Sequence, residues 1–203
     1  VLFRSTISGP IQATSAGSQS LTLVSKGGVI TLSDVIGSVA KLGTLTLGDA
    51  NQTGTITVDG TIVADSLVVG ASTGSNAFNV ALNNLSSAAG TTTISNAATF
   101  YNTGTIRFGD NYNDIFNFLG GVTANASSGI SINASQVNST ASAISLNSPT
   151  TIENSVTLSP GVGRITLGAT TVNPGATLTL GAGAATPMSL SSISGITGVK
   201  SNI

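Results

Sequence analysis

Short runs of alternating apolar and polar residues recur along the whole chain and limit what it can fold into. An alternation with a period of two places the apolar side chains on one face of a β-strand. Gly, Asn, Asp, Ser or Pro separates the runs about every 8 to 12 residues, and these residue types supply turns. No segment has the period of an amphipathic helix, so the chain is predicted to be all-β. The pairs predicted to point inward are Leu45/Leu47, Ile56/Val58, Ile106/Phe108, Phe116/Phe118, Ile130/Ile132, Ile144/Leu146, Val156/Leu158, Ile165/Leu167 and Leu178/Leu180.

One segment recurs at a nearly constant spacing. Gly43–Asp49 reads GTLTLGD, Gly104–Asp110 reads GTIRFGD, and Gly163–Gly168 reads GRITLG. A long internal period is typical of solenoids, in which each circuit of the chain, here termed a coil, stacks on the previous one. A period of about 60 residues divides into about three coils of about 20 residues, which predicts about ten coils in all.

The scarcity of charge separates a solenoid from the other all-β folds. Short regular strands also fit a sandwich or a barrel, but only 6% of the 203 residues are charged. Polarity comes instead from 29 Ser, 29 Thr, 25 Gly and 17 Asn residues. In a parallel β-solenoid each side chain stacks on a neighbour about 4.8 Å away, where like charges repel and hydroxyl or amide groups do not. The composition therefore favours a parallel β-solenoid.

The chain is expected to contain one solenoid with an edge on either side. Residues 20–185 are predicted to form the repeats, residues 1–19 an N-terminal edge, and residues 186–203 a C-terminal junction or edge. The first five residues look like a translated sequencing adapter, and we hypothesise that they are not native.

Composition also excludes several classes of function. There is no His and no Cys, which excludes sites and catalytic groups that use them as well as disulfides. The net charge is −1 with only six basic residues, so no nucleic-acid surface is expected. No apolar run approaches the length of a transmembrane helix. Parallel β-helix enzymes that cut polysaccharides need clustered catalytic groups, and the seven acids are scattered, so the chain is predicted not to be an enzyme.

The repeated segments carry a resemblance to a known class of proteins. GTLTLGDAN followed by GTITV in residues 43–58, and FYNTGTIRFGD followed by GGVTA in residues 100–124, are similar to repeats of large bacterial β-strand-repeat surface proteins. These are akin to filamentous haemagglutinin and autotransporter passenger regions, and the similarity covers about residues 20–185. It implies a secreted, right-handed parallel β-helix at the bacterial cell surface, without conserved catalytic residues.

Asp110 and Asp114 are the candidate metal ligands. The sequence DNYND concentrates oxygen ligands, which calcium prefers. Tyr112 stands at the third position and no closing Glu follows, so the pattern departs from known calcium loops. The alternative is that these Asp side chains cap the backbone of a turn. No cofactor other than calcium is expected.

Aromatic residues are unevenly placed, with six of the eight between residues 100 and 118. Phe108, Phe116 and Phe118 take alternating positions and are expected to point inward. Tyr101 and Tyr112 fall at strand edges or turns, which makes them candidates for a lateral contact or for stacking on a sugar. Arg107 is a charged residue within the aromatic repeat and is a third candidate for a specific contact.

The expected function is structural: an extracellular fibre, stalk or filament, built by end-to-end stacking of copies or by continuation of a longer chain. The alternative is an adhesin that binds carbohydrate through one solenoid face. Ice is a weaker alternative, because pairs such as Thr44/Thr46 would have to repeat on nearly every coil. Thr46 aligns with Arg107 in the matching segment, which would interrupt that array.

Overall fold

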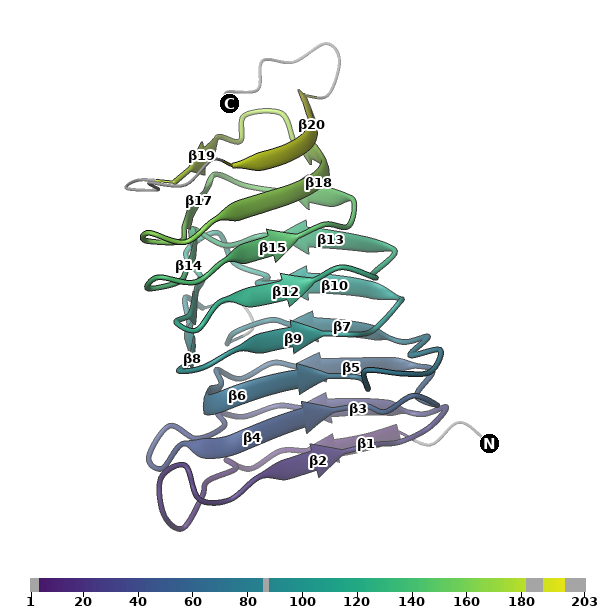
Figure 1. Cartoon of the computed structure of the whole chain (residues 1–203). Coiled ribbons are helices and arrows are strands. Elements are labelled where there is room, and N and C mark those ends of the chain that lie inside the picture. Colours follow the sequence, from purple (N-terminus) through teal and green to yellow (C-terminus); the bar gives the residue numbers. More distant parts are fainter. Residues whose placement is uncertain (1–3, 86–87, 182–187, 196–203) are drawn as a thin grey trace.

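A computed structural model describes residues 4–85, 88–181 and 188–195 of the chain, and within them it contains twenty strands and no helix. The strands stack into a parallel β-solenoid of about eight coils, so the predicted fold class is confirmed (Figure 1). In these described residues there is accordingly no helix with the length and hydropathy needed to cross a membrane.

Each coil contributes strands to up to three parallel sheets, which we call faces A, B and C in the order in which the chain visits them (Figure 1). Face A contains β1 (Arg4–Ile7), β3 (Val29–Leu32), β5 (Thr55–Val58), β7 (Asn79–Leu82), β10 (Thr105–Phe108), β13 (Gly129–Ile132), β16 (Thr150–Ile152) and the C-terminal parts of β18 (Ile165–Val172) and β20 (Ser189–Gly195). Face B contains β8 (Thr91–Ile94), β11 (Ile115–Phe118), β14 (Gln136–Asn138), β17 (Val156–Ser159), β19 (Leu178–Leu180) and the first residues of β6 (Val63–Val69). Face C contains β2 (Leu21–Leu23), β4 (Leu42–Leu47) except its first residue, the rest of β6, β9 (Ala98–Phe100), β12 (Val122–Ala124), β15 (Ile144–Leu146) and the N-terminal parts of β18 and β20.

The coils differ in length, which explains why there are about eight rather than about ten. On face A, Ile30 is in register with Ile56, whereas Ile130 is in register with Thr150, so the later coil is the shorter one. Loops between faces account for the difference. Residues 70–78 separate β6 from β7, but only residues 147–149 separate β15 from β16. Only the shorter coils match the length predicted from the sequence.

The long-period similarity does not correspond to whole coils. Its first copy contains β4 on face C, and its second contains β10 on face A. What the two copies share is local: each strand ends at a glycine with a positive φ, +77° at Gly48 and +80° at Gly109. A Cβ atom at Gly109 would lie 2.3 Å from the carbonyl oxygen of Asn133, so this sharp exit from the strand requires glycine. These two copies therefore share a strand-and-turn unit, whereas in the third copy Gly168 lies within β18.

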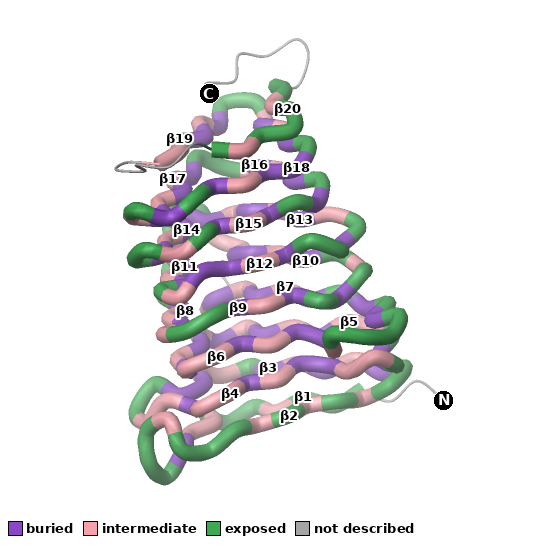
Figure 2. The backbone as a smooth tube through the Cα atoms, viewed as in Figure 1, coloured by how far each residue is buried: buried purple, intermediate pink, exposed green. Residues whose placement is uncertain are grey.

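The core is a set of aliphatic columns that run along the solenoid axis. Of the eighteen residues predicted to point inward, all except Leu180 are buried, and Leu180 is half-buried in the penultimate strand. Figure 2 shows the resulting alternation of buried and more exposed positions along the strands. In one column Ile56 stacks on Val80, which stacks on Ile106. In such a column an inward aliphatic side chain stacks on aliphatic side chains of the coils before and after it.

Four phenylalanines fill the middle of the solenoid. Phe108 contacts the rings of Phe100, Phe116 and Phe118 at centroid distances of 5.4, 5.5 and 5.6 Å. All four are buried, which confirms the inward orientation predicted for Phe108, Phe116 and Phe118. Ala124 compensates for part of this volume in the next coil, since it is in register with Phe100.

Amide side chains form the polar counterpart of the aliphatic columns. In each of three pairs one Asn donates from its Nδ2 atom to the Oδ1 atom of an Asn in the preceding coil, at 2.7–3.0 Å. Such a bond needs both a donor and an acceptor on the same side chain, which Asn has and an ion does not. The pairs are Asn138 with Asn117, Asn147 with Asn125, and Asn154 with Asn133.

The stacked strands extend on both sides of the predicted repeat range of 20–185. Arg4 and Ser5, two of the five residues suspected not to be native, lie in β1 in register with Val29 and Ile30. Residues 1–3 lie outside the described residues. In the predicted C-terminal junction, the described residues 188–195 include β20, which pairs with β18. The other residues of the junction, 186–187 and 196–203, lie outside the described residues.

Truncation of Phe108 tests the importance of the aromatic cluster. We expect Phe108→Ala to lower the free energy of unfolding by about 3 to 5 kcal/mol, because it leaves a cavity between three rings. Tyr112→Ala removes an aromatic ring that is 62% exposed and should change it by no more than about 0.5 kcal/mol. Urea denaturation of both variants measures this, and equal losses would contradict it.

Candidate functional site

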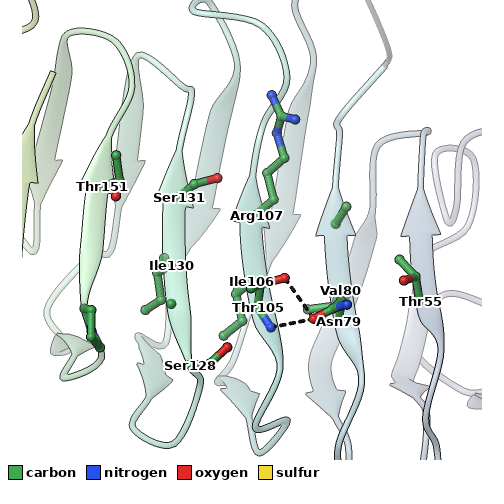
Figure 3. Close-up of a pocket in the computed structure, with 13 residues that line it drawn as sticks. Thr55, Asn79, Val80, Thr105, Ile106, Arg107, Ser128, Ile130, Ser131 and Thr151 are labelled. Carbon is green, nitrogen blue, oxygen red and sulfur yellow. Dashed lines mark hydrogen bonds between the residues drawn. The ribbon is translucent and has the colours of Figure 1, made fainter. Parts of the chain in front are cut away.

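A shallow groove of about 620 Å³ crosses the outer surface of face A. It spans five neighbouring strands, β5, β7, β10, β13 and β16, which Figure 3 shows side by side. The outward-facing side chains of these strands line it, because alternate residues of each strand point away from the core. Its polar lining includes Thr55, Asn79, Thr105, Arg107, Ser131 and Thr151.

The groove is hollow because small side chains occupy outward positions of β7 and β13, the strands on either side of β10. Ala81, Gly129 and Ser131 project little from the sheet, whereas Arg107 and Pro149 are larger and also line the groove. The intervening inward residues of these strands are buried in the aliphatic core. The backbone of the sheet and these small side chains therefore make the floor.

Hydrogen bonds fix part of the lining and leave part of it free. Asn79 Oδ1 accepts from both the backbone N–H and the hydroxyl of Thr105, at 2.8 and 3.0 Å. Within the described residues, no protein partner bonds Asn79 Nδ2 or the hydroxyls of Thr55, Ser131 and Thr151. These groups are available to a ligand or to water.

Arg107 is the charged residue that lines the groove, and its side chain extends along the direction of β10 (Figure 3). Its Nε donates to the carbonyl oxygen of Gly109 at 2.8 Å, and its Nη2 lies 3.6 Å from a carboxylate oxygen of Glu153. Both side chains are partly exposed, so the ion pair adds little stability. In the groove, the carboxylate of Glu153 offsets the positive charge of Arg107.

The three residues predicted to make specific contacts are not brought together. Arg107 lines the groove, whereas Tyr101 and Tyr112 do not. Tyr101 lies between β9 and β10 and is 37% exposed, and Tyr112 lies in the loop between β10 and β11. Lateral contact or sugar stacking by the two tyrosines stays a prediction.

Asp110 and Asp114 lie in the loop that leaves β10, where Asp114 is completely buried. Asp114 Oδ1 accepts from the backbone N–H of Gly90 in the preceding coil at 2.9 Å. Its Oδ2 accepts from the N–H groups of Asp110 and Asn111, both at 3.1 Å. Donors rather than further oxygen ligands thus surround this carboxylate, which favours the turn-capping alternative.

A metal at this loop stays a prediction. Among the residues that the structure describes, no three His, Cys, Asp or Glu side chains lie close enough together to hold an ion. Asp110 Oδ1 is buried and has no hydrogen-bond partner within the described part of the chain. That single atom is the feature of the loop that is compatible with calcium.

The expectation that Arg107 interrupts an ice-binding array of threonines is wrong. Thr46 lies on face C and Arg107 on face A, so Arg107 does not interrupt the column that contains Thr46. The interruption has another cause. Thr44 and Thr46 are in register with Ser66 and Val68 of the next coil, so the threonine pair is not repeated there.

Sequence reasoning did not find the groove. Its lining residues come from five coils of unequal length, and no periodicity in the sequence aligns Thr55 with Asn79 and Thr105. Arg107 was the one signal, as an isolated charge in an otherwise uncharged strand.

Comparison with protein-family models, curated proteins and solved structures found no match for this chain.

The buried Asp114 carboxyl makes a pH-dependent contribution to stability. Burial raises its pKa above the ordinary value of 3.8, Asp110 adds to this effect, and the three N–H donors oppose it. The folded state therefore holds the proton more tightly than the unfolded state, so this contribution is present at low pH and is lost as the pH rises through the raised pKa.

Asp114→Asn removes this titration and keeps the shape of the side chain. We expect the free energy of unfolding of the native protein, relative to that of the variant, to fall as the pH rises from below 3.8, the ordinary pKa of the carboxyl, through its raised pKa in the folded state. Urea titrations of both proteins at each pH measure this difference in the free energy of unfolding. The contributions of the other acidic residues are the same in both proteins and cancel. A difference that is constant or rises with pH would contradict the expectation.

Proposed function

We propose that this chain is a segment of an extracellular structural repeat protein, which forms a fibre, stalk or filament at a bacterial surface. The observation that carries the proposal is the open stack of strands at both ends of the solenoid. The resemblance of residues 43–58 and 100–124 to bacterial surface repeats supports the setting.

The ends of the stack have unpaired strand edges within the described residues. There β1 and β2 pair only with β3 and β4, and β19 and β20 pair only with β17 and β18. Apolar side chains accompany these edges, since Leu21 and Leu23 are only partly buried at one end and Leu190 is 40% exposed at the other. Unpaired edges beside apolar surface recruit further strands.

The stack is suited to continuation because all its strand pairs are parallel. A coil added at either end meets strands that run in the direction it needs, and no reversal of the chain is required. The added coil comes either from the same longer polypeptide or from another copy of the protein.

Low charge removes the usual obstacle to such assembly. The net charge is −1, so two copies repel one another weakly. Two ion pairs of the described residues, Lys41 with Asp65 and Arg107 with Glu153, neutralise part of the remaining charge. Mechanical continuity then comes from backbone ladders along the axis.

Charges at one open end test the assembly. We expect the native protein to form filaments with an axial repeat of about 4.8 Å in fibre diffraction. Leu21→Lys combined with Leu23→Lys places two charges at the end of the stack and should shorten or abolish the filaments seen in electron micrographs.

Val39→Lys is the matched control, because Val39 is 89% exposed on a lateral loop and takes no part in the end of the stack. It should leave filament length unchanged. Dispersed monomers of the full-length native protein, or equal loss of filaments in the control, would overturn the filament assignment.

A further inference from the structure

We propose that the groove on face A is a binding site for an uncharged linear polysaccharide that lies along the solenoid axis. This goes beyond the structural role and does not depend on end-to-end assembly. It rests on the shape of the groove, on its free polar groups, and on the state of Arg107.

The groove has the shape of a site for an extended ligand. Five strands at the usual spacing of parallel sheets make it about 19 Å long. Its volume of about 620 Å³ lies in the range of ligand sites, but it is open along its length rather than enclosed. A chain of several sugar rings fills such a groove better than a compact small molecule does.

The lining offers polar groups at successive coils. Thr55, Asn79, Ser131 and Thr151 each present a hydroxyl or an amide N–H that no group of the described protein satisfies. Ala81 and Pro149 add apolar surface to the lining. This mixture matches a sugar ring, which has hydroxyls at its rim and C–H groups on its faces. Repetition from coil to coil suits a ligand with a repeating unit.

The main alternative class of ligand, a peptide, fits the groove less well. Peptides that bind to sheets pair their backbone with an unpaired strand edge. The groove instead lies on the face of the sheet, where β7, β10 and β13 each already pair with a strand on both sides. No backbone groups are therefore left for a peptide.

The charge of the lining favours an uncharged polysaccharide over an acidic one. Arg107 is the charged lining residue, and Glu153 lies 3.6 Å from its Nη2 while its Nε bonds Gly109. A carboxylate on the ligand would have to compete with Glu153 for this guanidinium. A hydroxyl of an uncharged sugar does not have to displace Glu153.

Titration with defined oligosaccharides tests the site. The probes are hexamers of β-1,4-linked glucose, of β-1,4-linked mannose and of N-acetylglucosamine, together with a hexamer of galacturonic acid as the acidic probe, each followed by NMR chemical shifts. At least one neutral hexamer should bind, about tenfold or more tighter than the acidic one. The absence of binding by every neutral probe, or a preference for the acidic hexamer, would overturn the proposal.

Paired variants locate the binding. Ser131→Phe places a ring in the groove and should abolish binding, whereas Ser145→Phe makes the same change at an outward position of β15 on face C and should not. Ser131→Ala with Thr151→Ala removes two hydroxyls and should weaken binding about 3- to 10-fold.

Equal melting temperatures of the two Phe variants show that both are folded. Should Ser131→Phe be unstable, the double Ala variant, which adds no bulk, gives the same test. Loss of binding in Ser145→Phe but not in Ser131→Phe would place the site on another face and overturn the assignment. Filament length in Ser131→Phe reports the structural role separately, since β16 and β18 lie between β13, which carries Ser131, and the end strand β20.

Discussion

Each strand side chain inside this solenoid has to tolerate a side chain about 4.8 Å away, in the coil before and in the coil after. Aliphatic side chains meet this condition by forming continuous columns, as Ile56, Val80 and Ile106 do. Asn meets it in pairs, in which the amide N–H of one side chain donates to the amide oxygen of an Asn in the preceding coil. A row of ions cannot meet it without repulsion, and this accounts for a chain with 6% charged residues.

Departures from this rule are local and are compensated nearby. The phenylalanine cluster is larger than the aliphatic columns on either side, and Ala124 beside Phe100 makes room for it. Asp114 is a buried carboxyl in the loop after β10, and three backbone N–H groups converge on it. Its raised pKa shows that burial still outweighs those hydrogen bonds. Both departures lie next to β10, the strand that also carries Arg107.

The same rule connects the two functional proposals. Stacking that satisfies every internal strand leaves the end strands unsatisfied, which supports assembly along the axis. Stacking also leaves outward side chains on each face of every coil. These side chains do not pack in the core, so their chemistry can vary. On face A small residues at these outward positions produce a groove with unbonded hydroxyl and amide groups, which is the basis for a polysaccharide site.

Much of this architecture follows from the sequence alone. The period-two alternation determines the strands and their inward faces, including those of Phe108, Phe116 and Phe118, and the lack of charge determines a stacked fold. Only the tertiary structure decided which residues stack on which. Coils of unequal length set the register through the lengths of their loops, which no local pattern encodes. For that reason Thr46 is in register with Val68, although the sequence repeat aligns it with Arg107. The groove likewise depends on the register of five coils of unequal length.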